Sequence, residues 1–161
     1  MSKEHYPATQ AIRVMKEKGI TFTLHQYKYI EHGGTEVSAR ELGIDEYQVV
    51  KTLIMEDEKK SPFIVLMHGN RQVSTKNMAR VLGVKTVQIC DPKVAEHHSG
   101  YKVGGTSPFG TRKQLRIFIE DTILHLPEIY INAGLRGLLA KMAPSDLAAA
   151  LDAKPVSVAI E

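Results

Sequence analysis

A glycine-rich stretch in the second half of the chain is the first place where chemistry can be expected. Residues 100–110 read GYKVGGTSPFG, with four glycines, one proline and the small hydroxyl residues Thr106 and Ser107. This composition excludes a regular helix or strand, because glycine admits positive φ and proline fixes a turn. Free N–H groups in such a loop can surround an anion or a carbonyl oxygen. The alternative is a tight connection between two strands, and the Walker phosphate-binding pattern is absent.

Three single residues could take part in a reaction beside such a loop. Lys51 interrupts the apolar run of residues 49–55. A buried ammonium needs a partner or a task there, whereas the alternative is a lysine whose head reaches water. Asp146 can act in catalysis or only favour the first turn of a helix. Tyr27 lies on the polar face of an expected strand and carries no signal by itself.

Other chemistries find no support in the sequence. His97 and His98 are adjacent and point apart on a helix, and the remaining histidines have no metal-ligand spacing. Neither G-x-S-x-G nor HExxH occurs. Cys90, the single cysteine, ends an apolar strand without a histidine near it in sequence, which favours a buried structural thiol. We therefore expect no metal site, no cofactor and no internal disulfide.

Length and composition are typical of one globular domain. The chain has 161 residues, of which 43% are hydrophobic, and only 6% are aromatic. We find neither a signal peptide nor an apolar run long enough to span a membrane. The sequence therefore predicts a soluble cytoplasmic protein without a membrane partner, and the scarcity of aromatic residues disfavours a stacking platform for single strands.

The net charge of +3 conceals a basic central block. Residues 71–116 carry nine Lys and Arg against two Asp and Glu, whereas both flanking segments are slightly acidic. Because this block surrounds the glycine-rich stretch, it predicts a polyanion partner for that region. The alternative is a solvated surface whose charges are balanced by the acidic ends of the chain.

Periodicity places these residues on short interleaved helices and strands. Helices are expected at residues 7–18, from Thr35 to 42, at 74–82, at 91–98 and at 144–151. A helical turn is expected to begin at Asp45, and strands at 20–27, 49–55, 63–67, 85–90, 114–120, 129–132, 138–142 and 156–160, with a break at Ala133-Gly134. The pattern lacks a regular βαβ period. It predicts a single-domain α+β fold over residues 1–161, with a mixed, curved, barrel-like sheet and flanking helices.

Five spaced segments together resemble the YbaK-type deacylases, the editing-domain family associated with prolyl-tRNA synthetase. The resemblance covers nearly the whole chain in order. It rests on residues 22–27 (FTLHQY), 51–53 (KTL), 100–110, 133–137 (AGLRG) and 143–147 (APSDL). These proteins clear cysteine mischarged on tRNA(Pro), and their fold, a barrel-like mixed sheet with helices, agrees with the α+β prediction.

The resemblance implies roles for particular residues. Tyr27, Lys51 and Asp146 match the polar residues of the family's substrate cleft and would be catalytic. Residues expected to bind the aminoacyl ester are Gly104, Gly105, Thr106, Ser107, Pro108 and Gly134. Contacts with tRNA phosphates are assigned to Lys102, Arg112 and Lys113. The implied partners are tRNA(Pro) charged with cysteine and a prolyl-tRNA synthetase.

The family mechanism needs no protein nucleophile, because the thiol of the substrate cysteine attacks its own ester and releases a thiolactone. Lys51 would act electrostatically, and the loop N–H groups would face the developing oxyanion. Thr106 and Phe109 depart from the usual aliphatic residue and leucine of the family, which leaves amino-acid specificity open.

Two further functions stay open on the sequence. The same fold could hydrolyse Ala-tRNA(Pro) with water as the nucleophile. The chain could also be a non-catalytic module that binds tRNA or a synthetase, although retention of Tyr27, Lys51 and Asp146 argues against it.

Overall fold

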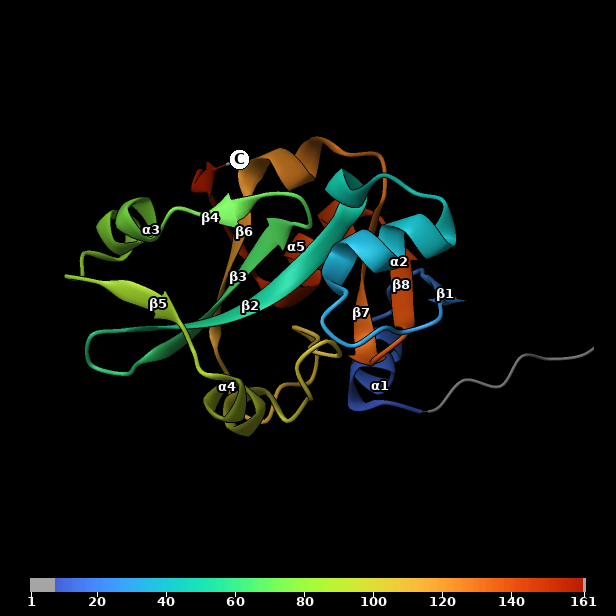
Figure 1. Ribbon diagram of the computed structural model, residues 1–161, viewed down its shortest axis with the longest axis horizontal. Coiled ribbons are helices and arrows are strands. Elements are labelled where there is room, and N and C mark those ends of the chain that lie inside the picture. The colour runs from blue at the N-terminus through green and yellow to red at the C-terminus, as the bar shows by residue number, and fades with distance from the viewer. Residues whose placement is uncertain (1–7, 161) are drawn as a thin grey trace, which may run out of the picture.

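The structure is a computed structural model that describes residues 8–160. Its centre is an eight-stranded mixed sheet with the strand order β1-β8-β7-β2-β3-β6-β9, and β5 pairs with the far end of β2 (Figure 1). The strands of this sheet are β1 (Thr23–Gln26), β2 (Val49–Asp57), β3 (Pro62–His68), β5 (Val87–Ile89), β6 (Arg116–Glu120), β7 (Ile129–Leu135), β8 (Leu138–Met142) and β9 (Lys154–Val156).

The helices and a small second sheet complete the described part of the chain. The α-helices are α1 (Gln10–Glu17), α2 (Gly34–Leu42), α3 (Thr75–Leu82), α4 (Pro92–Ser99) and α5 (Pro144–Leu151). Two 3-10 helices are η1 (Glu46–Gln48) and η2 (Asp121–His125), and β4 (Gln72–Val73) pairs with β10 (Ala159–Ile160). No helix within residues 8–160 is long and apolar enough to cross a bilayer.

The α+β prediction with a mixed sheet is confirmed, but the sheet does not close into a barrel. Strands β2 and β7, β3 and β6, and β6 and β9 run parallel, whereas the other pairs are antiparallel. In the order of described strands, β1 and β9 are the two ends and do not pair with each other. The sheet is therefore open at both edges.

Strand β2 alternates between two faces of the sheet, and each face has its own core. Val50 and Ile54 belong to a large apolar cluster on what we call the first face. Val49 and Met55 belong to smaller clusters on the opposite, second face. Because side chains alternate along a strand, Lys51 also points to the second face.

The helices divide between the two faces in the same way. Helices α1, α4 and α5 pack on the first face, where Met15, Ala95 and Leu147 lie in its cluster. Helices α2 and α3 pack on the second face through Ala39 and Met78. In Figure 1, α2 lies in front of β7 and β8, α3 lies beside β4 and β5, and α5 lies behind β2.

Local capping explains most helix boundaries. Ser74 Oγ accepts from the N–H of Asn77 at the start of α3, and Gly83 ends it with a φ of 70°. Helix α1 begins at Gln10, capped by the Thr9 side chain, whereas the expected start at Pro7 lies outside the described residues. The expected cap at Thr35 is wrong, because Gly33 occupies the N-cap of α2 without a side-chain hydrogen bond.

Three strand predictions need correction. The first strand is only Thr23–Gln26, shorter than residues 20–27. The expected break at Ala133-Gly134 is instead a bulge within β7, because the backbone returns to its pairing with β8 at Leu135. The last predicted strand is two short ones, β9 on β6 and β10 on β4. Between them, buried Glu120 Oε1 accepts from the N–H groups of Val158 and Ala159.

Candidate active site

Lys51 is the third residue of β2 and lies on the second face with a half-buried side chain. Its Nζ donates to the carbonyl of Gly69, 3.4 Å away. Burial lowers the pKa of Lys51, and the charge of Glu46 acts in the opposite direction. The ammonium therefore lies on the second face of the sheet, where it could interact with a ligand.

The Gly69 carbonyl, which accepts from Lys51, lies where the start of α2, η1 and the residue after β3 meet. Thr35 Oγ1 lies 2.7 Å from Glu46 Oε2 and 3.1 Å from the Gly69 carbonyl oxygen. A Cβ on Gly69 would come within 2.7 Å of Thr35 Oγ1, so this position tolerates no side chain. The N-terminal turn of α2 and η1 thus set the position of the Lys51 head group.

Asn132 on β7 is the neighbour of Lys51. The parallel pairing of β2 and β7 matches Val49 with Tyr130 and Val50 with Ile131, so Lys51 and Asn132 follow side by side. Since Tyr130 packs on the second face and Ile131 on the first, Asn132 points to the same face as Lys51. Asn132 is a candidate site residue that the sequence predictions missed.

The glycine-rich loop is fastened to this pair by Asn132. Asn132 Nδ2 donates to the carbonyl of Gly104 over 3.1 Å. Its Oδ1 accepts from the N–H groups of Gly134 at 2.7 Å and Leu135 at 3.1 Å, within the β7 bulge. One amide side chain therefore joins the bulge and the loop beside Lys51, although the two segments are far apart in sequence.

The glycines of the loop are required by this close approach. Gly104 has a φ of 90°, and a Cβ there would lie 2.8 Å from the hydroxyl of Tyr29. A Cβ on Gly105 would lie 2.9 Å from the backbone nitrogen of Arg136. Arg136 Nε in turn donates to the Val103 carbonyl, 2.9 Å away, so the loop rests on the β7–β8 turn.

The loop also presents unused backbone donors. Within residues 8–160, the N–H groups of the exposed Gly104 and the half-buried Thr106 have no hydrogen-bond acceptor. The buried Ser107 uses its Oγ to accept from the N–H of Phe109, which fixes the turn before the chain leaves. Backbone donors of this kind suit a carbonyl oxygen that becomes negative during a reaction.

Tyr27 and Gly134 frame the same region. Tyr27 follows β1, donates its N–H to the Gly137 carbonyl over 2.9 Å and packs against the second-face cluster that contains Val49. Burial is the largest influence on the Tyr27 hydroxyl and raises its pKa, so the phenol is neutral at physiological pH. Gly134 has a φ of 92°, and a Cβ there would meet the Tyr101 ring at 2.8 Å.

Asp146 is separated from this group. It is exposed in the first turn of α5, where its N–H donates to the Ala143 carbonyl. The next residue, Leu147, is buried in the first-face cluster, so α5 covers the side of the sheet opposite Lys51. The structure brings Lys51, Gly104 and Gly134 together through Asn132. Tyr27 packs on the same second face, whereas Asp146 belongs to a helix that packs on the first face.

The basic residues expected to contact phosphate are exposed near the loop. Lys102 lies within the glycine-rich stretch, and the backbone N–H groups of Arg112 and Lys113 donate to the end of α4 at Ser99 and His98. A Cβ on Gly100 would lie 3.6 Å from Arg112 Cβ, so this segment folds back onto the start of the loop.

The surroundings of Cys90 in the described structure do not favour a nucleophilic thiolate. The side chain is buried, and burial raises its pKa to about 11. Among residues 8–160, no group of three or more His, Cys, Asp and Glu could hold a metal ion.

Comparison with known proteins decides the family. The family described as "Aminoacyl-tRNA editing domain" matches residues 33–150, which contain Lys51, the glycine-rich loop and Asn132. The chain belongs to the aminoacyl-tRNA editing domain family. Tyr27 lies before the matched range.

Two individual proteins that are similar to this editing domain are also associated with tRNA by their names. The editing domain is 29% identical over 143 residues to EbsC of Enterococcus faecalis, which is named as a candidate Cys-tRNA(Pro)/Cys-tRNA(Cys) deacylase; the match covers 88% of this chain and 87% of EbsC. A proline–tRNA ligase of Brachyspira hyodysenteriae is 26% identical over 83 residues, which are 52% of this chain and 14% of the ligase.

A solved structure shows the same fold. A crystal structure described as a candidate trans-editing enzyme for prolyl-tRNA synthetase superposes with a TM-score of 0.85 at 19% identity. The superposition covers 98% of the editing domain and 100% of that protein. The open mixed sheet with its two helical layers is therefore the fold of this family.

Proposed function

We propose that this editing domain is a trans-editing deacylase that removes mischarged cysteine from tRNA(Pro). The observation that carries the proposal is the hydrogen bond from Asn132 to Gly104, which holds the glycine-rich loop against β7 beside Lys51. The similarity to EbsC and to a proline–tRNA ligase supports this choice of substrate. Because charged tRNA is used in translation, we place the activity in the cytoplasm.

In the proposed reaction the substrate supplies the nucleophile. The cysteine thiol, after losing its proton, attacks the carbonyl carbon of its own ester and forms a C–S bond. The C–O bond to the terminal ribose then breaks, the ribose hydroxyl takes a proton, and a cyclic thiolactone leaves. Water later opens the thiolactone to free cysteine. Holding thiol and ester in one geometry supplies much of the acceleration.

The protein's part in this reaction is electrostatic. The N–H groups of Gly104 and Thr106 would donate to the carbonyl oxygen as it becomes negative, and the Lys51 ammonium would stabilise the same charge. Tyr27, neutral because its pKa is raised, can donate one further hydrogen bond. Asp146 has no part in this proposal.

The test is a comparison of aminoacyl groups on one tRNA. The purified protein should consume Cys-tRNA(Pro) far faster than Ser-tRNA(Pro), because a hydroxyl is a much poorer nucleophile at neutral pH. Alkylating the substrate thiol should protect the ester, and mass spectrometry should find thiolactone before free cysteine. Preferential turnover of Ala-tRNA(Pro) would instead support the water-dependent hydrolase, and turnover of none of the three would refute the deacylase.

A further inference from the structure

A basic hollow lies between α3 and β5, on the second face of the sheet. Helix α3 packs on that face through Met78, and β5 pairs with Met55–Asp57 at the far end of β2. The hollow has a volume of about 440 Å³, and Ala79 and the buried Val87 are part of its wall. It is distinct from the Lys51 site in its residues and in its position along the strand.

The charges of this hollow are all of one sign. Lys76 and Arg80 of α3 and Lys85 of the following turn line it, together with the hydroxyl residues Thr75 and Thr86. All three cations are exposed, and within the described part of the chain none of them forms an ion pair or a side-chain hydrogen bond. Three cations without ion-pair partners, beside hydroxyl donors, suit the oxygens of phosphodiesters.

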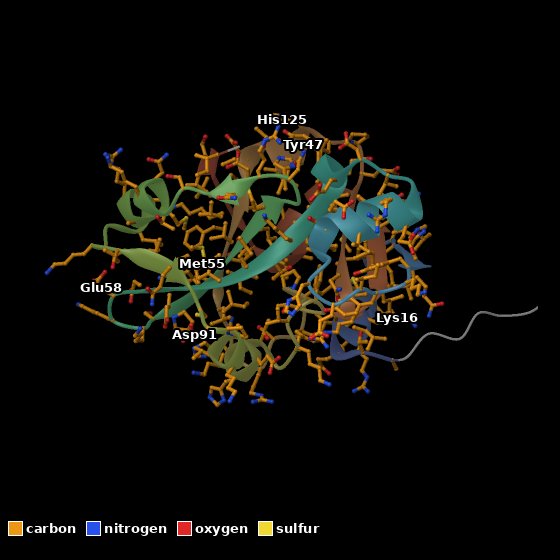
Figure 2. The ribbon with its side chains drawn as sticks, in the orientation of Figure 1. Lys16, Tyr47, Met55, Glu58, Asp91 and His125 are labelled. Carbon is orange, nitrogen blue, oxygen red and sulfur yellow. The ribbon has the colours of Figure 1, made fainter. Side chains whose placement is uncertain are left out.

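The carboxylates nearby are already engaged. Glu58, at the tip of the β2–β3 hairpin beyond Met55 (Figure 2), accepts from the backbone N–H groups of Lys85 and Thr86 through Oε1. Asp57 Oδ1 accepts from the N–H groups of Lys59 and Ser61. Both side chains line an adjoining hollow of about 570 Å³. Glu58 fixes the turn that presents Lys85, whereas Asp57 fixes the β2–β3 hairpin.

The hollow has a defined spatial relation to the Lys51 site. Both lie on the second face, and the residues of β2 that pair with β5 begin four positions after Lys51. At about 3.3 Å per residue of strand, the separation is roughly 13 to 20 Å. A nucleic acid whose 3′ end reaches Lys51 can therefore pass its backbone over the hollow on the same face.

We infer that the α3–β5 hollow binds the phosphodiester backbone of the tRNA body, as a second contact beyond the aminoacylated end. This inference rests on the proposed function. It divides the basic block of residues 71–116 into two surfaces, one beside the glycine-rich loop with Lys102, Arg112 and Lys113, and one formed by Lys76, Arg80 and Lys85.

The experiment compares two sets of charge reversals with the same change in net charge. One variant carries Lys76→Glu, Arg80→Glu and Lys85→Glu. The control carries Arg13→Glu, Lys16→Glu and Lys18→Glu on and just after α1, which covers the first face; Lys16 lies across the molecule from Glu58 in Figure 2. Thermal melting checks that both remain folded, and a glutamine version of the first variant replaces it if it does not.

Binding of uncharged tRNA(Pro) is measured over a range of salt concentrations. The hollow variant should bind roughly 10-fold or more weakly at low salt, because sequence-independent affinity comes from phosphate contacts. The slope of log affinity against log salt should fall by about 2 to 3, since each phosphate contact contributes about 1. The control should keep most of the affinity and the slope of the wild type. Equal binding by the hollow variant and the wild type would overturn the inference.

Turnover of a short substrate separates this inference from the proposed function. A cysteinyl ester of the trinucleotide CCA has no tRNA body, so wild type and hollow variant should cleave it at the same rate. An equal loss on the short substrate would overturn the inference, because the hollow would then act through the active site. Loss of binding to a prolyl-tRNA synthetase with unchanged tRNA binding would overturn it in favour of an acidic protein partner. Failure of the wild type on every ester refutes the deacylase and leaves the binding result to be judged by itself.

Discussion

Asn132 and Gly104 are 28 positions apart, yet the side-chain amide of the first donates to the backbone carbonyl of the second over 3.1 Å. This bond couples the β7 bulge to the glycine-rich loop. Lys51 lies beside Asn132 on the neighbouring strand, so the same amide sets the distance between the loop and the cation. We expect the arrangement of the candidate site to depend on the Asn132 hydrogen bonds more than on any single charged group.

Asn132→Ala should therefore lower deacylation strongly. It releases the Gly104 carbonyl and removes the acceptor of the Gly134 and Leu135 N–H groups, which should cost about 1 to 3 kcal/mol of folding free energy. We expect kcat/KM on Cys-tRNA(Pro) to fall on the order of 100-fold, as for a lost oxyanion donor. Asn132→Asp keeps the acceptor and loses the donor to Gly104, so it should melt closer to wild type while remaining impaired. A fully active Asn132→Ala variant would contradict the proposed role of the Asn132 hydrogen bonds in positioning the loop.

Lys51→Ala should abolish most turnover and leave the fold intact. If the ammonium stabilises developing charge, the loss should be on the order of 100-fold or more in single-turnover experiments. Lys51→Arg should rescue little, because the guanidinium differs in reach and geometry. Lys59→Ala, at an exposed lysine of the β2–β3 hairpin, is the matched control. Wild-type rates in Lys51→Ala would reduce Lys51 to a lysine that only covers apolar surface.

The pH profile should report the Lys51 ammonium. Its pKa is lowered from the 10.5 of a free lysine, chiefly by burial, so the charge and the activity should be lost on the alkaline side below that value. Glu46→Gln removes the charge that raises this pKa, so the alkaline limb should move to lower pH. Glu36→Gln, at an exposed residue of α2, should leave the limb in place. An alkaline limb that does not respond to Glu46→Gln would contradict the assignment.

Cys90→Ser should remain active. The thiol is buried with its pKa raised to about 11, so it is protonated at neutral pH and a poor nucleophile. Alkylation of the folded protein at pH 8 should be slow and should become fast on unfolding. A folded but inactive Cys90→Ser enzyme would move the attack from the substrate thiol to the protein.

Asp146→Ala should change deacylation by less than about 3-fold, because Asp146 is exposed on the helix that covers the face opposite Lys51. The loss should appear in melting instead, at about 0.3–1 kcal/mol for a carboxylate in the first turn of a helix. The kinetics of this variant distinguish an exposed residue without a catalytic role, as its position indicates, from the catalytic residue that the family resemblance implies. A large fall in kcat would restore that role.

Most elements could be predicted from local patterns, because their caps and periodicity act over a few residues. Helix α3 between Ser74 and Gly83 is one example, and the strand at 138–142 is another. Thr35 was misread because a threonine before a helix resembles a cap, whereas here its hydroxyl contacts Glu46 and Gly69. A contact between α2, η1 and the end of β3 leaves no trace in the sequence around Thr35.

The site was predicted in part for the same reason. Lys51 and the glycine-rich loop carry their own signals, an ammonium in an apolar run and an unusual density of glycine. Asn132 was missed because its value depends on the parallel pairing of β2 with β7, which periodicity does not reveal. The Asn-Ala-Gly turn signal after an apolar strand was present and could have identified it. Asp146 was assigned by resemblance alone, without knowledge of which face α5 covers.

The pairing of β1 with β8 brings two segments that are far apart in sequence into adjacent strands, with Thr23 opposite Lys141. The candidate site takes residues from four widely separated segments: the residue after β1, the start of β2, the glycine-rich loop and β7. Contacts between segments so far apart in sequence form slowly, because the chain loses entropy before the stabilising contacts form. During refolding, helical signal should therefore return before deacylation does, and recovery of activity would time the last docking event of the chain.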